Sequence, residues 1–242
     1  MLNTLRQPKW VAATVVVLLL AGLFVRLGLW QLDRLQERKL ENAVGIARST
    51  AEPVDLGEAL RSVQGDLESL EHLNVVVTGE YDPGEEVLIR SQVALGQAGY
   101  HVITPLVVGE GEAVLVNRGW VPLGMDEPPV GAAPEPGTQE VTGFVHLSAT
   151  RPPLGAEEPE GDLGVMNRVD LERIGEQVPY DLAPVYVVTT GETGDQLPIP
   201  VDPPDFTDEG PHLAYAIQWF GFAVIGLVGF WFLLRRSSRQ TS

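Results

Sequence analysis

The chain has 242 residues, no cysteine and a formal net charge of −17. All 33 acidic residues lie within 31–211, whereas both terminal segments are apolar and carry only basic charges. This excess of acid argues against nucleic acid as a partner, because a polyanion would be repelled. Without cysteine there are no disulfides, no thiolate metal sites and no dithiol redox chemistry.

Residues 10–30, WVAATVVVLLLAGLFVRLGLW, predict a first transmembrane helix that follows a short tail, residues 1–9. A helix of about 20 apolar residues is long enough to cross the bilayer core. A cleaved signal peptide is the alternative, but no A-x-A cleavage site follows the apolar run, which favours a retained anchor. Arg26 can reach the outer interface with its guanidinium, or it can face the second helix or a bound anion.

Residues 212–234 predict a second transmembrane helix, and residues 235–242 a second short tail. Arg6 and Lys9 precede the first helix, and three arginines follow the second. By the positive-inside rule both termini are expected in the cytoplasm. The central domain, residues 31–211, carries 10 basic and 33 acidic residues, a net charge of −23. It is therefore expected outside the cytoplasm, in a multi-pass protein of the cell membrane whose two helices contact the lipid bilayer.

The central domain is expected to have an α+β fold with a mainly antiparallel sheet or a partial barrel. Short turns at 82–84 and 109–111 indicate hairpins between neighbouring strands. Helical spacing indicates helices at 54–70 and 169–178. Three loops rich in Pro, Gly and acid lie at 124–137, 151–164 and 194–211. Runs rich in β-branched residues predict strands at 73–81, 86–90, 100–108, 112–121, 140–148 and 184–190.

Nothing in the sequence indicates an active site. It contains no nucleophile elbow, phosphate loop, dinucleotide fingerprint or H-E-x-x-H helix. The four histidines, at 72, 101, 146 and 212, lack the spacing of metal ligands, so no zinc or copper site is expected in the soluble domain. The sequence therefore predicts a protein that is not an enzyme.

The phrase RLGLWQLDRLQERK, residues 26–39, lies where the first helix leaves the membrane. Trp30 is an interfacial aromatic residue, and Arg34 and Arg38 continue a cationic face at helical spacing. This face can anchor to lipid headgroups, or it can bind carboxylates, which arginine holds bidentately.

Two further phrases, GQAGYHVITPL (96–106) and VLVNRGWVP (114–122), lie on consecutive predicted strands. Arg118 and Trp120 are expected to share a face and flank Gly119, which permits a bulge or a close approach of another backbone. The arrangement predicts either a hydrogen-bonded corner packed beneath Trp120 or an edge that faces a ligand or partner.

The phrase HLAYAIQWFGF begins where the second helix enters the membrane. A histidine followed by small residues and an aromatic residue leaves room for a flat ligand against the helix, and histidine is a common axial ligand of haem iron. A wetted interface histidine is the alternative. The stripe consists of His212, Ala216, Trp219, Ala223 and Gly226, with Tyr215 beside it.

In order and content these phrases resemble the surfeit-locus protein one family of cytochrome c oxidase assembly factors. The matching positions are Leu27, Gly28, Trp30, Gln31 and Arg34, with Arg38 and Lys39 one place late for the cation, then Gly99, Tyr100, Val102 and Thr104 to Leu106, then Val116 to Pro122, and finally His212, Leu213, Tyr215, Ala216, Trp219 and Phe220. One departure is that Gly210 and Pro211 stand where the family often has Asn near the closing His.

The resemblance implies a role in building haem-copper cytochrome c oxidase, in which the protein binds haem a and aids its insertion into the catalytic subunit. His212 matches the histidine implicated in haem binding and is the candidate metal ligand, with Tyr215 and Trp219 beside it and Arg34 and Arg38 as cations for the propionates. The implied partners are the oxidase catalytic subunit and the enzymes that make haem a. The alternatives are a membrane-anchored adaptor or sensor domain, or a haem-independent assembly chaperone, in each case with no cofactor.

Overall fold

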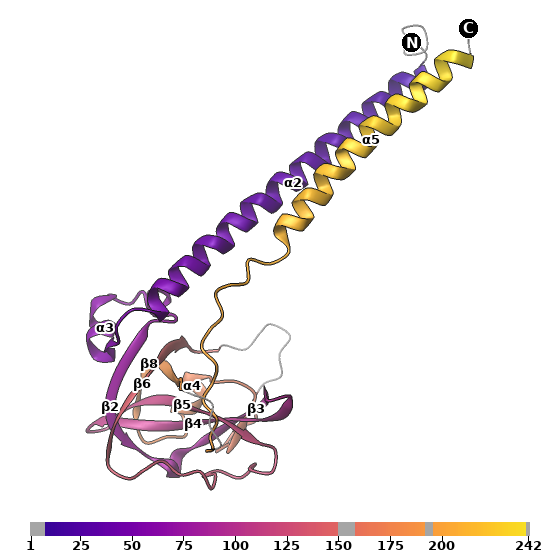
Figure 1. Ribbon diagram of the computed structural model, residues 1–242. Coiled ribbons are helices and arrows are strands. Elements are labelled where there is room, and N and C mark those ends of the chain that lie inside the picture. The colour runs from indigo at the N-terminus through magenta and orange to yellow at the C-terminus, as the bar shows by residue number, and fades with distance from the viewer. Residues whose placement is uncertain (1–7, 150–157, 192–195, 241–242) are drawn as a thin grey trace. The chain divides into compact units, whose positions relative to one another are not determined.

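The computed structural model describes residues 8–149, 158–191 and 196–240, and the chain forms two compact units. We call them the helical unit, residues up to Val44 and from Asp205 onward, and the barrel unit, Gly45–Pro204. Figure 1 shows the two long helices of the first unit and the strands of the second. Each unit is described by itself below.

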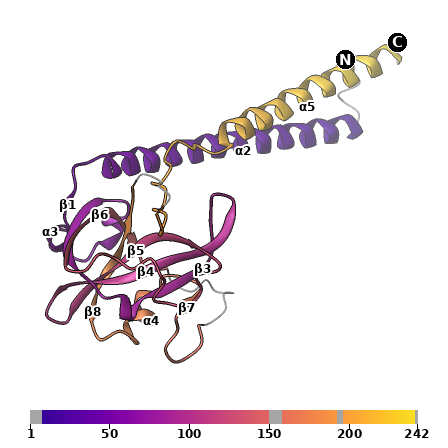
Figure 2. The same cartoon turned by 60° about the horizontal axis from the view of Figure 1, so that its bottom comes forward.

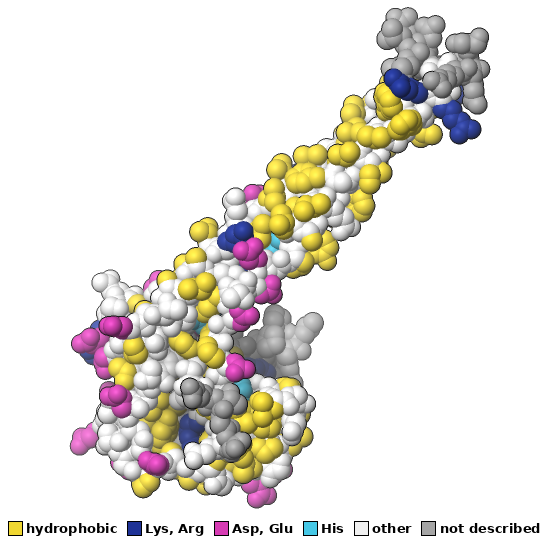
Figure 3. Space-filling model, in the orientation of Figure 1, with side chains coloured by type: hydrophobic (Ala, Val, Ile, Leu, Met, Phe, Trp, Pro, Cys, Tyr) yellow, Lys and Arg dark blue, Asp and Glu magenta, His cyan; other side chains and the backbone are white. Residues whose placement is uncertain are grey.

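The helical unit contains α2 (Pro8–Ser49), whose last residues belong to the barrel unit, and α5 (His212–Gln240). Both helices are long and apolar enough to cross a membrane. Hydrophobic side chains are spread along the visible face of this pair, and basic side chains lie near the end that carries the termini (Figure 3). The helix α2 continues well beyond the predicted span because the residues after Trp30 include neither Gly nor Pro until Gly45.

The barrel unit confirms all six predicted strands, with ends shifted by a few residues. Two short strands, β1 (Val54–Asp55) and β7 (Val165–Met166), were not expected. The six are β2 (Asn74–Tyr81), β3 (Val87–Ala94), β4 (Gln97–Gly109), β5 (Glu112–Pro122), β6 (Thr138–Leu147) and β8 (Asp181–Thr189).

The strands close into a five-stranded barrel in the order β2-β6-β8-β5-β4, because β4 also pairs with β2. The expected mainly antiparallel sheet or partial barrel is thus confirmed, with one parallel pair inside the barrel, β5 and β8. The strands of the barrel curve around a common interior (Figure 2). That interior is filled by apolar side chains such as Val75, Leu106, Val116 and Val145, all fully buried.

The turn 82–84 does not join a hairpin, so that prediction was wrong. The strands β2 and β3 both pair with β4. β2 pairs with Leu106 and Val107 of β4, and β3 pairs with the preceding part of β4, up to Ile103. The chain therefore turns a corner at Asp82, whose N–H donates to the carbonyl of Pro105. The long strand β4 offers one edge to two successive partners, which a short turn alone does not reveal. The other predicted hairpin, between β4 and β5, is confirmed.

The two predicted helices of the barrel unit are shorter than expected. The first is divided into α3 (Leu56–Ser62) and the 3-10 helix η1 (Leu67–Leu70), separated at Gly65, whose φ of 97° is incompatible with a helix. The second is α4 (Leu171–Gly175). Asp55 caps α3 and Asp170 caps α4 by accepting backbone N–H groups.

The phrase VNRGW forms a bulged corner on β5. The register against β4 shifts between Asn117 and Gly119, and Gly119 has a φ of 125°. A Cβ on Gly119 would lie 2.2 Å from the carbonyl oxygen of Ile199, so only glycine lets that segment approach. Trp120 is buried and exchanges two backbone hydrogen bonds with Ile199, at 2.7 and 2.8 Å. This edge therefore forms the packed, hydrogen-bonded corner that the sequence allowed.

Arg118 enters a buried ion pair with Glu86, at 3.2 Å between Nη1 and Oε2. The same carboxylate accepts hydrogen bonds from the hydroxyl of Thr104 at 2.9 Å and from the backbone N–H of Val130 at 2.8 Å. The other end of the Arg118 guanidinium donates to the carbonyl of Ala132. These contacts attach the loop 124–137 to the barrel, and every charge in them is paired.

His101 on β4 is held neutral by its surroundings. The Oδ1 atom of Asn117 accepts the N–H of Gly119, so the Nδ2 group faces the ring and donates to Nδ1 of His101 at 3.1 Å. Burial lowers the pKa of His101 from 6.5 to about 4. If Nδ1 of His101 were protonated, its N–H would face the N–H of the Asn117 amide, and two donors cannot form a hydrogen bond. The folded state therefore disfavours the charged ring.

A loss of stability at acidic pH follows from this histidine. Because its pKa is lower when folded, stability is fully present above pH 6.5 and is lost as pH falls toward 4. We expect the loss to be about 2 kcal/mol, since one pKa unit corresponds to roughly 1.4 kcal/mol and the ring is partly solvated. His101→Gln keeps an acceptor for Asn117 without titrating and should flatten this part of the profile. Pulse proteolysis in urea between pH 4 and 8 measures it, and parallel losses in both proteins would contradict the assignment.

Candidate functional site at the paired helices

The two helices of the helical unit pack along a stripe of small and apolar residues. On α2 the buried positions Gly28, Gln31 and Leu35 recur three or four residues apart, as expected for a helix that faces another helix. A Cβ on Gly28 would lie 2.6 Å from the ring of Phe220, so the missing side chain lets α5 approach closely. Figures 1 and 2 show the two helices side by side.

His212, the first residue of α5, contacts Gln31, which belongs to this stripe. The two atoms, Nδ1 of His212 and Oε1 of Gln31, are 2.9 Å apart. An amide oxygen only accepts, so this geometry puts the imidazole proton on Nδ1 and leaves Nε2 as the basic nitrogen. Gln31 is 9% exposed, which makes it a fixed partner rather than a surface side chain.

The chain that leads into α5 is tied to α2 by two further contacts. The amide of Asn42, a buried side chain, donates to the carbonyl of Asp208 at 3.1 Å. Lys39 forms an ion pair with Glu209 at 3.3 Å. Next to them Gly210 lies against the His212 ring, where a Cβ would be 3.4 Å from Nε2. The position of the imidazole is therefore set from both sides.

The small-residue stripe of α5 is not an open slot. Ala216 and Ala223 are 1% and 4% exposed, because the stripe faces α2. Trp219 stacks on Phe24 of α2, with ring centroids 5.7 Å apart. The room that the sequence indicated for a flat ligand is thus filled by helix packing, and a ligand of His212 has to lie on the outer face of the pair. Tyr215, 47% exposed, is on that outer surface.

Arg34 and Arg38 do not contact His212. Each pairs with the glutamate three residues later on α2, Arg34 with Glu37 at 2.6 Å and Arg38 with Glu41 at 3.4 Å. Their side chains are 55% and 47% exposed, so these pairs hold them only weakly. Residues seven positions apart point within about 20° of the same direction on a helix. Arg38 therefore lies on the same face of α2 as Gln31, about 10 Å further along the helix. Both guanidinium groups can exchange their carboxylates for others.

Gln31 is the functional candidate to which sequence reasoning assigned no role. The available signal was a glutamine just past an interfacial tryptophan, in the phrase that carries the family resemblance. Its partner lies 181 positions away in the chain, and no local pattern links the two residues.

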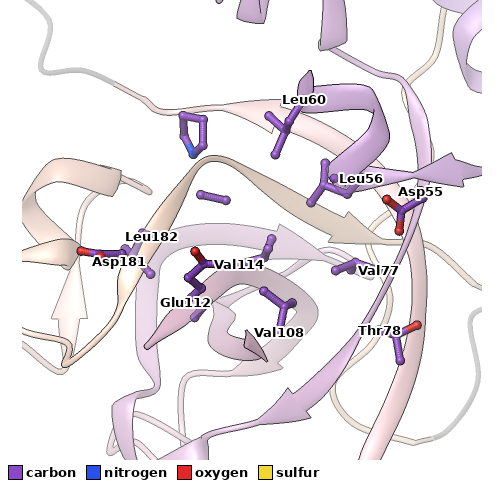
Figure 4. A pocket seen from close by; sticks show the side chains of 14 residues that line it. Asp55, Leu56, Leu60, Val77, Thr78, Val108, Glu112, Val114, Asp181 and Leu182 are labelled. Carbon is purple, nitrogen blue, oxygen red and sulfur yellow. The ribbon is translucent and has the colours of Figure 1, made fainter. Parts of the chain in front are cut away.

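A cavity of about 470 Å³ in the barrel unit is a less suitable haem site. Leucines of α3 and valines of β2, β4 and β5 line it (Figure 4). The carboxylates of Asp55, Glu112 and Asp181 line it as well. Three acidic groups would repel the propionates of a haem, and the cavity has no histidine or other axial ligand.

A second cluster with metal-ligating chemistry lies in the barrel unit, where Glu71, His72 and His146 meet. The expectation that no metal site forms in this domain rested on sequence spacing, and the fold brings two of the separated histidines together. Burial acts to raise the pKa of Glu71, but its hydrogen bonds with His146 and with the backbone N–H of Leu147, together with charge interactions with the two histidines, lower the pKa overall. Burial lowers the pKa of His72, against the opposing charge of Glu71.

Comparison with known proteins agrees with the resemblance of the four phrases. A family model described as the SURF1 family matches residues 18–224. A SURF1-like protein of Mycobacterium bovis is 29% identical over 93% of this chain and 83% of its own length. One from Rickettsia felis is 28% identical over 92% of this chain and 96% of its own, and one from Caenorhabditis elegans is 28% identical over 92% and 74%.

Proposed function

Because the chain belongs to the SURF1 family, which is associated with cytochrome oxidase assembly, we propose that it binds haem a at His212 and aids its insertion into the catalytic subunit of a haem-copper oxidase. Binding and release are sufficient for this role, so the protein acts without catalysing a reaction. Its partners are the oxidase catalytic subunit and the enzymes that supply haem a.

The observation that carries this proposal is the hydrogen bond between Gln31 and His212. Histidines that bind metals commonly donate their second ring N–H to an oxygen acceptor, which fixes the ring and raises the basicity of the other nitrogen. Oε1 of Gln31 is such an acceptor: it is buried and lies 2.9 Å from Nδ1 of His212, so Nε2 is the nitrogen left to bind iron. A single neutral ligand at a helix end is also one that a carrier can surrender.

The other predicted residues fit a ligand on the outer face of the helical pair. Bound haem a would supply an apolar macrocycle and two propionates. Tyr215 and Trp30, both about half exposed, offer aromatic surface, while Trp219 supports the pair from within through Phe24. Arg34 and Arg38 would exchange their glutamate partners for propionates.

One observation favours a haem-independent assembly chaperone instead. Arg34 and Arg38 already have carboxylate partners, and Ala216 and Ala223 are buried, so the helical unit is complete without a cofactor. In that case the same surface of α2 and α5 would hold an oxidase intermediate directly.

Removal of the protein separates these roles from an unrelated one. A deletion strain is expected to lose most active haem-copper oxidase while other membrane enzymes are unaffected, because the assembly step is specific. Oxygen uptake and reduced-minus-oxidised spectra of membranes measure this, and re-expression of the full chain is the control. Normal haem a content with normal oxidase activity would refute both forms of the proposal.

We also propose that both termini are cytoplasmic and that residues 31–211 lie outside. Support comes from the basic ends, the net charge of −23 of this segment and two helices long enough to span. Protease added to spheroplasts should digest the central domain and leave tags on both termini intact. Digestion of either tag in sealed spheroplasts, or a protected domain, would contradict this topology.

A further inference from the structure

Pairing of β2 with β6 brings the side chains of His72 and His146 together. The register Asn74↔Phe144 extends backward along the chain, where the N–H of His72 donates to the carbonyl of Val145 at 2.9 Å. The N–H of Val145 in turn donates to the carbonyl of Leu73 at 3.0 Å. Two residues thus oppose one, which is the pattern of a β-bulge, and bulges often redirect a side chain beside a functional site.

His72 has a left-handed backbone conformation, with a φ of 63°. This conformation is unfavourable for residues with a Cβ, although histidine, asparagine and aspartate adopt it more often than others. The bulge directs the imidazole toward Glu71 and His146. Nδ1 of His72 lies 3.9 Å from Oε1 of Glu71, and the two imidazole rings meet edge to face with centroids 5.1 Å apart.

The carboxylate of Glu71 is held in place by the backbone. Its Oε2 accepts the N–H of Leu147 at 2.9 Å, which leaves Oε1 facing the two histidines, 3.0 Å from Nδ1 of His146. Arg48 donates to the backbone carbonyl of Glu71 at 3.1 Å and so leaves the carboxylate itself available. The His146 ring stacks on Tyr186 of β8, with centroids 5.6 Å apart. Oriented ligands of this kind are typical of metal sites.

We propose that Glu71, His72 and His146 bind one late divalent transition-metal ion, Zn²⁺ or Cu²⁺. One ligand atom from each residue lies within 4.8 Å of the others. Ligand atoms around Zn²⁺ bonded at about 2.1 Å lie roughly 3.4 Å apart, so small side-chain rotations close the site. Two imidazoles and one carboxylate suit these ions and do not suit Mg²⁺ or Ca²⁺, which take oxygen ligands.

The site is accessible and incomplete, which suits an exchangeable ion. The side chains of Glu71 and His72 are each 28% exposed and that of His146 is 26% exposed. Three protein ligands leave at least one coordination position for water or a group from a partner. An ion bound here replaces the Glu71–His146 contact by bonds from both residues to the metal. The proposal is independent of haem binding, because none of these residues belongs to the helical unit.

Metal titration of the full chain tests this inference. The protein, purified in detergent without a histidine tag and stripped with chelator, is titrated with Zn²⁺ by calorimetry and with Cu²⁺ by electron paramagnetic resonance. We expect one saturable equivalent and a hyperfine pattern from two nitrogens. His72→Asn tolerates the left-handed backbone, and Glu71→Gln keeps the acceptor for Leu147, so both should fold and bind at least about tenfold more weakly.

Two control variants make the result specific. His101→Gln removes an imidazole of the barrel unit outside the cluster, and His212→Ala removes the proposed haem ligand; both should bind the metal as the unmodified chain does. Metal binding by His212→Ala tests the metal site separately from the haem proposal, because this result does not depend on whether the chain binds haem a. Absence of a saturable equivalent, or equal affinity in His72→Asn, Glu71→Gln and the unmodified chain, would overturn the site.

Discussion

His212→Ala is expected to abolish co-purification of haem a with the full chain. The substitution removes the nitrogen proposed to bind iron, while the helix persists because alanine is favourable in its first turn. Expression in a strain that makes haem a, followed by absorbance of the detergent-purified protein, measures the loss through the Soret band. Oxidase activity in the same cells should fall toward that of the deletion strain.

Variants of the neighbouring residues grade this effect. Gln31→Leu keeps the ligand and fills the buried position, but it removes the acceptor for Nδ1, so we expect haem a affinity to fall by about tenfold. Gln36→Leu changes an exposed glutamine of the same helix and is the matched control. Replacement of Arg34 and Arg38 together by glutamine should weaken binding less than His212→Ala does, because exposed ion pairs contribute little.

An unaltered haem spectrum in His212→Ala would rule out this histidine as the ligand. The haem-independent chaperone would then account better for the four phrases of the family resemblance. The same conclusion would follow if the deletion strain lost oxidase activity but the purified unmodified chain carried no haem a.

Glu86→Ala is expected to destabilise the barrel unit by about 3 to 5 kcal/mol, because it leaves the buried guanidinium of Arg118 without its counter-charge. It also removes the acceptor for Thr104 and Val130. The free energy of unfolding of a domain is commonly only about 5 to 15 kcal/mol, so this loss removes a large part of the stability of the barrel unit. Hydrogen exchange of β4 and β5 in the full chain at constant pH measures the free energy of opening.

Glu140→Ala, at an exposed position of β6, is the matched control and should change stability by less than about 0.5 kcal/mol. The double variant Glu86→Ala with Arg118→Ala should lose less than the sum of the two single changes, by at least about 1 kcal/mol, since each single change leaves an unpaired charge. Additive losses would show that the ion pair is not the source of the effect.

The phrases of the family resemblance separate into two structural groups, one in each unit. Four consecutive residues of β5 each have a role within the barrel. Asn117 orients His101, and Arg118 pairs with Glu86. Gly119 leaves room for Ile199, and Trp120 fills the corner. The first and last phrases meet at Gln31 and His212. The haem proposal therefore depends on the phrases of the helical unit, and the phrases of the barrel unit are accounted for by folding.

Local patterns determined much of this protein. Continuous apolar runs predicted both long helices, β-branched runs predicted six strands, and Gly119 was expected to permit either a bulge or a close backbone approach, because each of these depends on residues close together in the chain. The distribution of charge led to the proposed membrane topology, which stays a prediction. The same patterns identified His212 as a candidate ligand, but not its hydrogen-bond partner.

Pairing across long separations was decided only by the tertiary structure. Closure of the barrel aligned β5 with β8 in parallel and set β2 and β3 along one edge of β4, although a short turn suggested a hairpin. Helix packing brought Gln31 to His212 and filled the stripe at Ala216, and strand register brought His72 to His146. These contacts arise from burial of apolar surface between distant segments, which no window of neighbouring residues encodes.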